Sequence, residues 1–227
     1  YIWRPKNLPW IRRMDPGFFL NYNHDFSNPA NFQQANFYIF PIYLIFTNGS
    51  FLQYAIYPTW QNINFSFAPL GIPIEQGSYF YTRQQVNFNT DQSAQLSGSG
   101  SVNWGRFYQG SRTTLQAGLR YAPFVQAALT LDYEYNDIRQ LGLLNEDLET
   151  HLVTVGGRVA LNPRIQVSAF YQYNSFDQQG RWNIRGSWEY QPLSFVYIVF
   201  NDRQVNGLDE PLMEQQLITK ITLVKQF

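Results

Sequence analysis

Apolar and polar residues alternate with a period of two along nearly the whole chain, and this limits the folds open to it. The pattern is clearest at 180–190, where Trp182, Ile184 and Trp188 occupy even-numbered positions and mostly polar residues occupy the odd-numbered positions. Successive side chains of a β-strand point to opposite faces of the sheet. The segment is therefore predicted to be a strand with one apolar and one polar face.

Five further segments repeat this alternation: 115–121, 127–136, 153–160, 165–174 and 217–226. At about 3.3 Å per residue and a tilt near 40°, a nine-residue step spans roughly 20–25 Å, the height of a barrel's apolar band. The pattern predicts a lipid-facing set of Trp182, Ile184, Trp188, Tyr190, Leu129, Leu131, Val155, Val167, Tyr171, Ile221 and Leu223. It predicts an inward-facing set of Asn183, Arg185, Asp132, Glu134, Thr154, Arg158, Gln166, Gln172 and Asn174.

Composition agrees with a membrane-spanning β-sheet. Charged residues make up 14% of the chain and aromatic residues 18%, whereas soluble domains carry about 25% charged residues. The longest apolar run, 37–46, contains Pro41 and is shorter than the roughly 20 residues that a spanning helix needs. The net charge is zero and cysteine is absent. We therefore expect no nucleic-acid partner, no disulfide framework and no cofactor.

Turn signals suggest how the strands are connected. Short breaks at 47–50, 122–123, 162–164 and 191–192 alternate with longer connections at 27–30, 68–77, 137–149 and 205–214. Outer-membrane barrels have short periplasmic turns and long extracellular loops. The sequence thus predicts an all-β, antiparallel transmembrane β-barrel of about 12 strands over 15–227, or the C-terminal part of a larger barrel. Residues 1–14 are expected to form a periplasmic lead-in or linker without a lipid-facing strand.

Three further expectations follow from this fold. A glycine- and serine-rich stretch at 93–108 slips out of phase after Gly105, which predicts a bulge. If the barrel closes on itself, the strand at 17–25 must pair with the strand at 217–227, because no edge stays open in a membrane. The alternative fold is a soluble sandwich or lipocalin-like barrel, in which the apolar faces would point inward.

Several motifs resemble a known family. Trp104-Gly-Arg-Phe-Tyr-Gln-Gly110, Tyr133-Glu-Tyr-Asn-Asp137, Phe170-Tyr-Gln-Tyr-Asn-Ser175, the segments 181–185, 188–190 and 195–201, and 12–18 are similar to parts of a family of large outer-membrane proteins. That family carries a domain of unknown function, usually after a carbohydrate-binding-like β-sandwich. The resemblance covers most of the chain and implies a bacterial outer-membrane location. It carries no established activity to any residue.

The expected function is non-enzymatic. We expect an integral outer-membrane barrel that acts as a membrane anchor or conduit within a larger envelope protein or assembly. Its expected partners are outer-membrane lipid, lipopolysaccharide and other envelope proteins. A passive solute pore is the alternative within this class, and an outer-membrane hydrolase is the alternative from another class.

The candidate site consists of charged residues predicted on the polar faces of the strands. They either form an ion-pair network that fills a narrow lumen or a constriction that selects solutes. These residues are Arg83, Arg120, Asp132, Glu134, Arg158, Arg185, Glu189 and Asp202. His24 and His151 are expected at the outer rim, outside any catalytic group, since a hydrolase needs a Ser–His pair oriented by a third residue. No Gly-x-Ser-x-Gly motif or paired metal-ligand spacing accompanies them.

Overall fold

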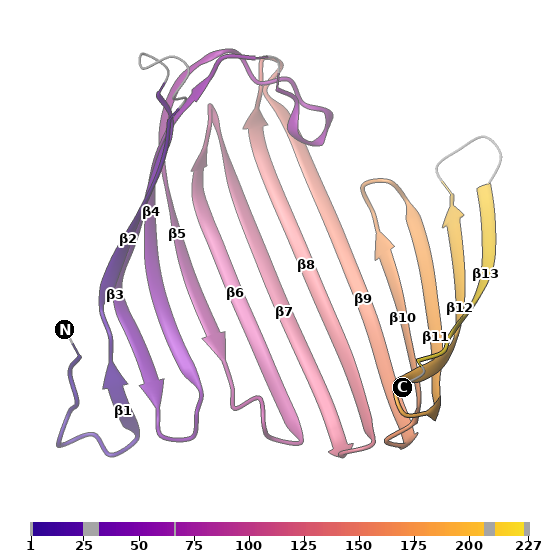
Figure 1. The fold of residues 1–227 in the computed structure, drawn as a ribbon. Coiled ribbons are helices and arrows are strands. Elements are labelled where there is room, and N and C mark those ends of the chain that lie inside the picture. The colour runs from indigo at the N-terminus through magenta and orange to yellow at the C-terminus, as the bar shows by residue number, and fades with distance from the viewer. Residues whose placement is uncertain (1, 25–31, 66, 207–211, 225–227) are drawn as a thin grey trace. The chain divides into compact units, whose positions relative to one another are not determined.

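The computed structural model describes residues 2–24, 32–65, 67–206 and 212–224, and they form one antiparallel sheet of thirteen strands (Figure 1). One 3₁₀ turn, η1 (Pro69–Gly71), interrupts the connection between the fourth and fifth strands. The strands are β1 (Ile11–Met14), β2 (Gly17–His24), β3 (Phe32–Phe46), β4 (Phe51–Ile63), β5 (Gly77–Asn89), β6 (Leu96–Phe107), β7 (Gly110–Phe124), β8 (Ala127–Leu141), β9 (Glu146–Asn162), β10 (Ile165–Asn174), β11 (Gln179–Gln191), β12 (Ser194–Val205) and β13 (Leu212–Thr222).

The two first strands share one position in the sheet. Both pair with β3, β1 through Met14 opposite Leu44 and β2 through Gly17 opposite Phe40. Pro16 separates them, and proline has no N–H to donate to the ladder. The thirteen strands thus fill twelve positions, thirteen less the shared one, which agrees with the predicted number. Residues 11–14 of the predicted lead-in join the sheet as β1, and the absence of a lipid-facing strand in 1–14 stays a prediction.

The sheet is open in the part of the chain that the structure describes. From β3 to β13 the strands lie in sequence order, and the described residues of β13 pair with β12 alone. The predicted closure between 17–25 and 217–227 is therefore not shown, and residues 25 and 225–227 of these segments lie outside the described ranges. The chain divides into two compact units, 1–92 with 99–116 and 135–149, and 93–98 with 117–134 and 150–227.

In the second unit the strand registers sort the side chains onto two faces. Tyr171 lies opposite both Val155 and Trp182, and Trp188 lies opposite Val196. We call the face that carries these residues the apolar face, and the opposite one the polar face. Nine of the eleven predicted lipid-facing side chains are exposed instead of packed in a core, and Tyr171 and Tyr190 are partly buried. Trp182 is 43% exposed, and the others are Ile184, Trp188, Leu129, Leu131, Val155, Val167, Ile221 and Leu223.

The connections differ from the predicted lengths. The predicted loop 137–149 is mostly strand, because β8 continues to Leu141 and β9 begins at Glu146. Arg139 forms ion pairs there with Asp137, Asp147 and Glu149, so charged residues extend the two strands instead of ending them. The predicted bulge after Gly105 is instead the end of β6, followed by a turn at 108–109.

A buried apolar cluster lies in the first unit, where the connection between β4 and β5 folds back onto strand ends. Ile72 and Ile74 of this connection pack with Tyr81, Tyr108 and Leu141. Gly142 has a φ of +71°, and a Cβ there would lie 2.7 Å from both Ile72 Cγ2 and Pro73 O. The connection predicted at 68–77 as a long extracellular loop is therefore a packed element of the fold.

Candidate binding surfaces on the polar face

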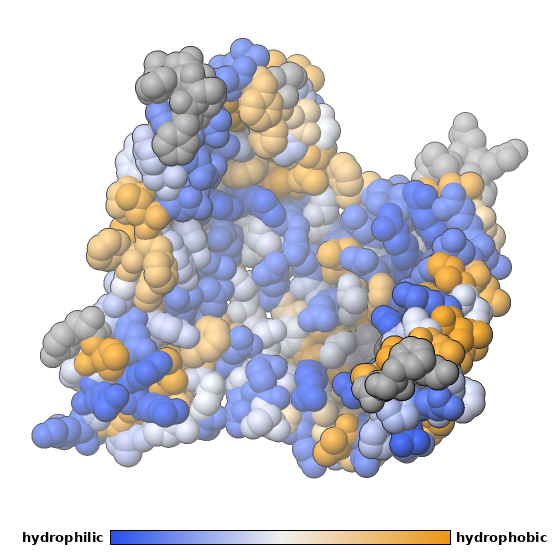
Figure 2. Space-filling view, viewed as in Figure 1, coloured by the Kyte–Doolittle hydropathy of each residue, from blue (hydrophilic) through white to orange (hydrophobic). Residues whose placement is uncertain are grey.

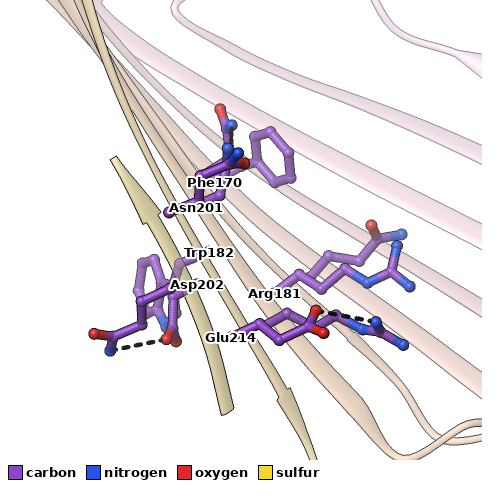
Figure 3. Close-up of a pocket in the computed structure, with 11 residues that line it drawn as sticks. Phe170, Arg181, Trp182, Asn201, Asp202 and Glu214 are labelled. Carbon is purple, nitrogen blue, oxygen red and sulfur yellow. Dashed lines mark hydrogen bonds and ion pairs between the residues drawn. The ribbon is translucent and has the colours of Figure 1, made fainter. Parts of the chain in front are cut away.

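A hollow of about 810 Å³ lies over β10 to β13 in the second unit (Figure 3). Its polar-face residues form two cross-strand rows. Gln172, Arg181, Arg203 and Glu214 form one row, and Phe170, Asn183, Asn201 and Gln216 form the other. Figure 3 shows Arg181 and Glu214 on one side of the strands, and Trp182 and Asp202 on the other. Hydrophilic residues also gather on the side seen in Figure 2 over the upper parts of β12 and β13.

Hydrogen bonds hold the two arginines of this hollow in place. Arg181 Nη2 donates to Gln179 Oε1 over 2.6 Å, and Arg203 Nε donates to the same oxygen over 3.3 Å. Arg203 Nη1 also lies 3.2 Å from Glu214 Oε2, in a partly exposed ion pair. Such pairs contribute little to stability. The surface thus carries two arginines, one of them paired with Glu214, among amide side chains.

A second pair of arginines lies further along the same strands. Ser168 of β10 lies opposite Arg158 of β9 on one side and Arg185 of β11 on the other. Neighbouring strands are about 4.8 Å apart, so the two arginine backbones are roughly 10 Å apart across Ser168. The Arg185 guanidinium carbon lies 4.8 Å from the ring centroid of Tyr197. The structure therefore brings these two predicted residues into one row.

The other predicted charges of the second unit are placed as follows. A Cβ on Gly156, a polar-face residue opposite Phe170, would lie 2.5 Å from Thr130 Oγ1. Thr130 is therefore on the polar face, and Asp132 and Glu134 share its parity along β8. Arg120 lies on β7, and Glu189 accepts a hydrogen bond from the Leu193 N–H over 3.0 Å.

Asp202 was assigned to the wrong face. It lies opposite Trp182 and Gln215, on the apolar face, and only 6% of its surface is exposed. Gln204 Nε2 and Gln215 Nε2 donate to its two carboxylate oxygens over 2.9 and 3.1 Å. Asp202 was assigned to the polar face because it is charged. Its position in β12, two residues after the apolar Phe200, puts it on the same face as Phe200.

Sequence reasoning also missed Arg181, Arg203 and Glu214 as site residues. The sequence does place Arg181 on the polar face, because it is four residues before the predicted Arg185 in the same strand. Arg203 likewise has the parity of Asn201. Their convergence with Glu214 depends on the register between three strands, which alternation within single strands does not give.

Arg83 belongs to the first unit, in a different environment. It lies opposite Tyr57 and Gly105, and its guanidinium carbon is 5.9 Å from the Phe107 ring centroid. Arg112 contacts the same ring at 5.7 Å, and its Nη2 donates to Asn136 Oδ1 over 2.7 Å. Aromatic rings and arginines thus alternate on this wall.

Each of the two histidines lies beside a tyrosine ring. The Tyr133 hydroxyl lies 2.8 Å from His151 Nδ1, and the two rings stack. Ser175 Oγ accepts a hydrogen bond from the backbone N–H of His151, not from its ring. His24 stacks on Tyr22. Within the described ranges, no three His, Asp or Glu residues gather as metal ligands.

We expect His24→Ala and His151→Ala to leave any native function unchanged, because neither ring belongs to a nucleophile–base–orienting group. The measurement is hydrolysis of p-nitrophenyl esters and of phospholipid by purified, folded protein. Hydrolysis that disappears with either substitution would establish the hydrolase alternative.

The sequence matches no protein-family model, curated protein or solved structure. The resemblance to the family of large outer-membrane proteins therefore stays a prediction. Among the described residues, no helix is long and apolar enough to cross a membrane.

Proposed function

We propose that this chain is the β-barrel region of an integral outer-membrane protein, and that it acts without catalysis as an anchor or conduit within a larger envelope protein or assembly. The observation that carries the proposal is the exposed apolar face. Val159, Val167, Gly186, Ile198 and Thr219 form one row of this face across β9 to β13. Val155, Tyr171 and Trp182 form a second row across β9 to β11, which ends on β12 and β13 in the hydrogen-bonded pair Asp202 and Gln215. A continuous exposed apolar surface marks contact with a membrane or a protein.

Aromatic residues at the strand ends favour lipid over a protein partner. Tyr171 and Trp182 contact each other near one end, with ring centroids 4.7 Å apart, and Trp188 and Tyr190 meet near the other end of β11. The Tyr190 hydroxyl donates to the Thr222 carbonyl over 3.2 Å. Rings with one polar atom suit the two interfaces of a bilayer, where transmembrane barrels carry their aromatic girdles.

A passive, anion-preferring pore is the second candidate. Arg158 and Arg185 flank Ser168 on the polar face, and Arg181 and Arg203 are neighbours in the next hollow. Rows of arginine side chains select anions in pores. Conductance of planar bilayers containing the protein separates an anchor from this pore, because an anchor gives no ion current and this pore gives a current carried mainly by anions.

Cysteine substitutions at Val167 and Ser168 test the membrane orientation, since the chain has no cysteine of its own. These neighbours in β10 lie on the apolar and polar faces respectively. A bimane label on Val167→Cys should be strongly quenched by nitroxide-labelled lipid, and one on Ser168→Cys should not, because only the first faces acyl chains. The matched depth of the two positions makes each the control for the other. Equal quenching, or quenching at 168 alone, would rule out the proposed orientation.

A further inference from the structure

A second cavity, of about 230 Å³, lies in the first unit where β2, β3, β4 and β5 present their polar-face residues. Its aromatic wall is formed by Phe19, Tyr38 and Tyr57. Tyr38 stacks on Tyr57 with ring centroids 4.6 Å apart, and Phe19 stacks on Tyr38 at 6.3 Å. Drug-sized ligands occupy cavities of roughly 300–1,000 Å³, so this cavity suits a smaller solute.

Two polar side chains in this wall lack partners. Asn36 and Arg83 both line the cavity, and Asn36 Oδ1 and Arg83 Nε are buried without a hydrogen-bond partner among the described residues. A buried polar atom left unpaired costs about 1–3 kcal/mol. Native proteins leave few such atoms, and each marks a place where water, an ion or a ligand completes the set.

The hydroxyls of Tyr57 and Tyr81 do not fill this role, because they are engaged elsewhere. The Tyr57 hydroxyl donates to Gln85 Oε1, and the Tyr81 hydroxyl donates to Gln61 Oε1 over 3.2 Å. No carboxylate of the described residues pairs with Arg83, whose recorded contact is the face of Phe107. The guanidinium therefore keeps its positive charge uncompensated beside the cavity.

The register fixes the spacing of the two unpaired groups. Asn36 lies opposite Thr59, which lies opposite Tyr81, and Arg83 is the next polar-face residue along β5. Asn36 and Arg83 are thus two strands and two residues apart, roughly 12 Å between backbones. Both side chains line the cavity, whose wall also carries the rings of Tyr38 and Tyr57. A ligand there needs an acceptor for arginine, a donor for the amide oxygen, and a ring that lies on the aromatic wall.

We propose that this cavity is a binding site for a small, ring-containing hydroxy carboxylate. The carboxylate binds the Arg83 guanidinium, which pairs with planar anions through two parallel N–H groups. A hydroxyl donates to Asn36 Oδ1, and the ring packs on Tyr38. The proposal rests on the proposed function only for the route by which the solute reaches the polar face.

Binding is tested with folded protein in detergent by saturation-transfer NMR and calorimetry. Glucuronate and 4-hydroxybenzoate supply the same two groups on a saturated and an aromatic ring, and glucose and phenol are their uncharged counterparts. We expect at least one acid to bind and its counterpart to bind at least about tenfold more weakly, since a hydrogen bond to a charged group contributes about 1.5–3 kcal/mol. The acid that binds identifies the ring type.

Variants assign the binding to the cavity. Arg83→Gln should weaken the acid at least about tenfold, because the amide keeps donors but loses the charge. Arg164→Gln, which changes an arginine of the turn between β9 and β10, should leave the affinity unchanged, and heat-modifiable gel migration confirms that both variants fold. The proposal is overturned if neither acid binds, if the neutral compounds bind equally well, or if Arg83→Gln binds like the parent. These results do not depend on the bilayer labelling of positions 167 and 168, so the two proposals fail separately.

Discussion

Leu131→Arg is expected to lower the free energy of unfolding from a bilayer by about 2–4 kcal/mol, the cost of an arginine on the lipid face near the midplane. Leu131 is 44% exposed, and its parity in β8 is that of Leu129. Leu129 lies on the apolar face, because its Cδ2 is 3.4 Å from the position of a Cβ on Gly157, which lies opposite Ala169. The measurement is urea-dependent refolding into lipid vesicles, followed by tryptophan fluorescence and heat-modifiable gel migration.

Thr130→Arg is the matched control, one residue away on the polar face. It should cost less, because an arginine there extends into water instead of hydrocarbon. Equal losses at the two positions would count against a lipid-facing Leu131, and a larger loss at 130 would invert the assignment of faces.

Gly105→Ala should lower the free energy of unfolding by about 3 kcal/mol, through strain at a special backbone conformation and a clash. Gly105 has a φ of +141°, which side chains rarely adopt, and a Cβ there would lie 2.5 Å from Thr82 O and 2.8 Å from Arg83 Cα. These are backbone atoms of the neighbouring strand, so they cannot move without disturbing the pairing of β5 with β6.

Gly100→Ala on the same strand provides the comparison. A Cβ there meets only Gln116 O, at 3.9 Å, so we expect a change within about 0.5 kcal/mol. Urea-dependent refolding of both variants measures the difference. If Gly105→Ala is as mild as Gly100→Ala, then β5 and β6 do not approach each other as closely as described.

Alternation predicted the strands well because it reports directly which face of the sheet each side chain occupies. The alternation predicted the strands from β7 to β13 and their antiparallel order, since consecutive strands joined by short turns pair with each other. It failed at 137–149, where Asp137 and Arg139 suggested a loop. Charged residues extend strands beyond an apolar band as readily as they end them, and here Arg139 pairs with carboxylates on the next strand.

The candidate surfaces were less predictable because they depend on register. Arg158 and Arg185 were both predicted on the polar face, but their alignment across Ser168 requires two strand pairings. The cavity beside Arg83 draws residues from four strands, and a bulge in β3 near Pro41 shifts the parity there. A shift of one residue moves every later side chain to the other face, so short-range pattern alone does not place Asn36 and Arg83 on one wall.

The buried cluster beneath the connection from β4 to β5 implies an order of folding. Seven of the ten buried apolar residues belong to this cluster, and among those described beyond residue 150 only Val205 is buried. Hydrophobic burial in water can therefore assemble the contacts of Ile72 and Ile74 with Tyr81 and Leu141 first. On the proposed membrane function, the strands from β9 onward gain comparable stabilisation only once hydrocarbon covers their apolar face. On this proposal the two parts of the chain depend on different solvents, and the buried cluster is available as a nucleus before the lipid-facing strands complete the sheet.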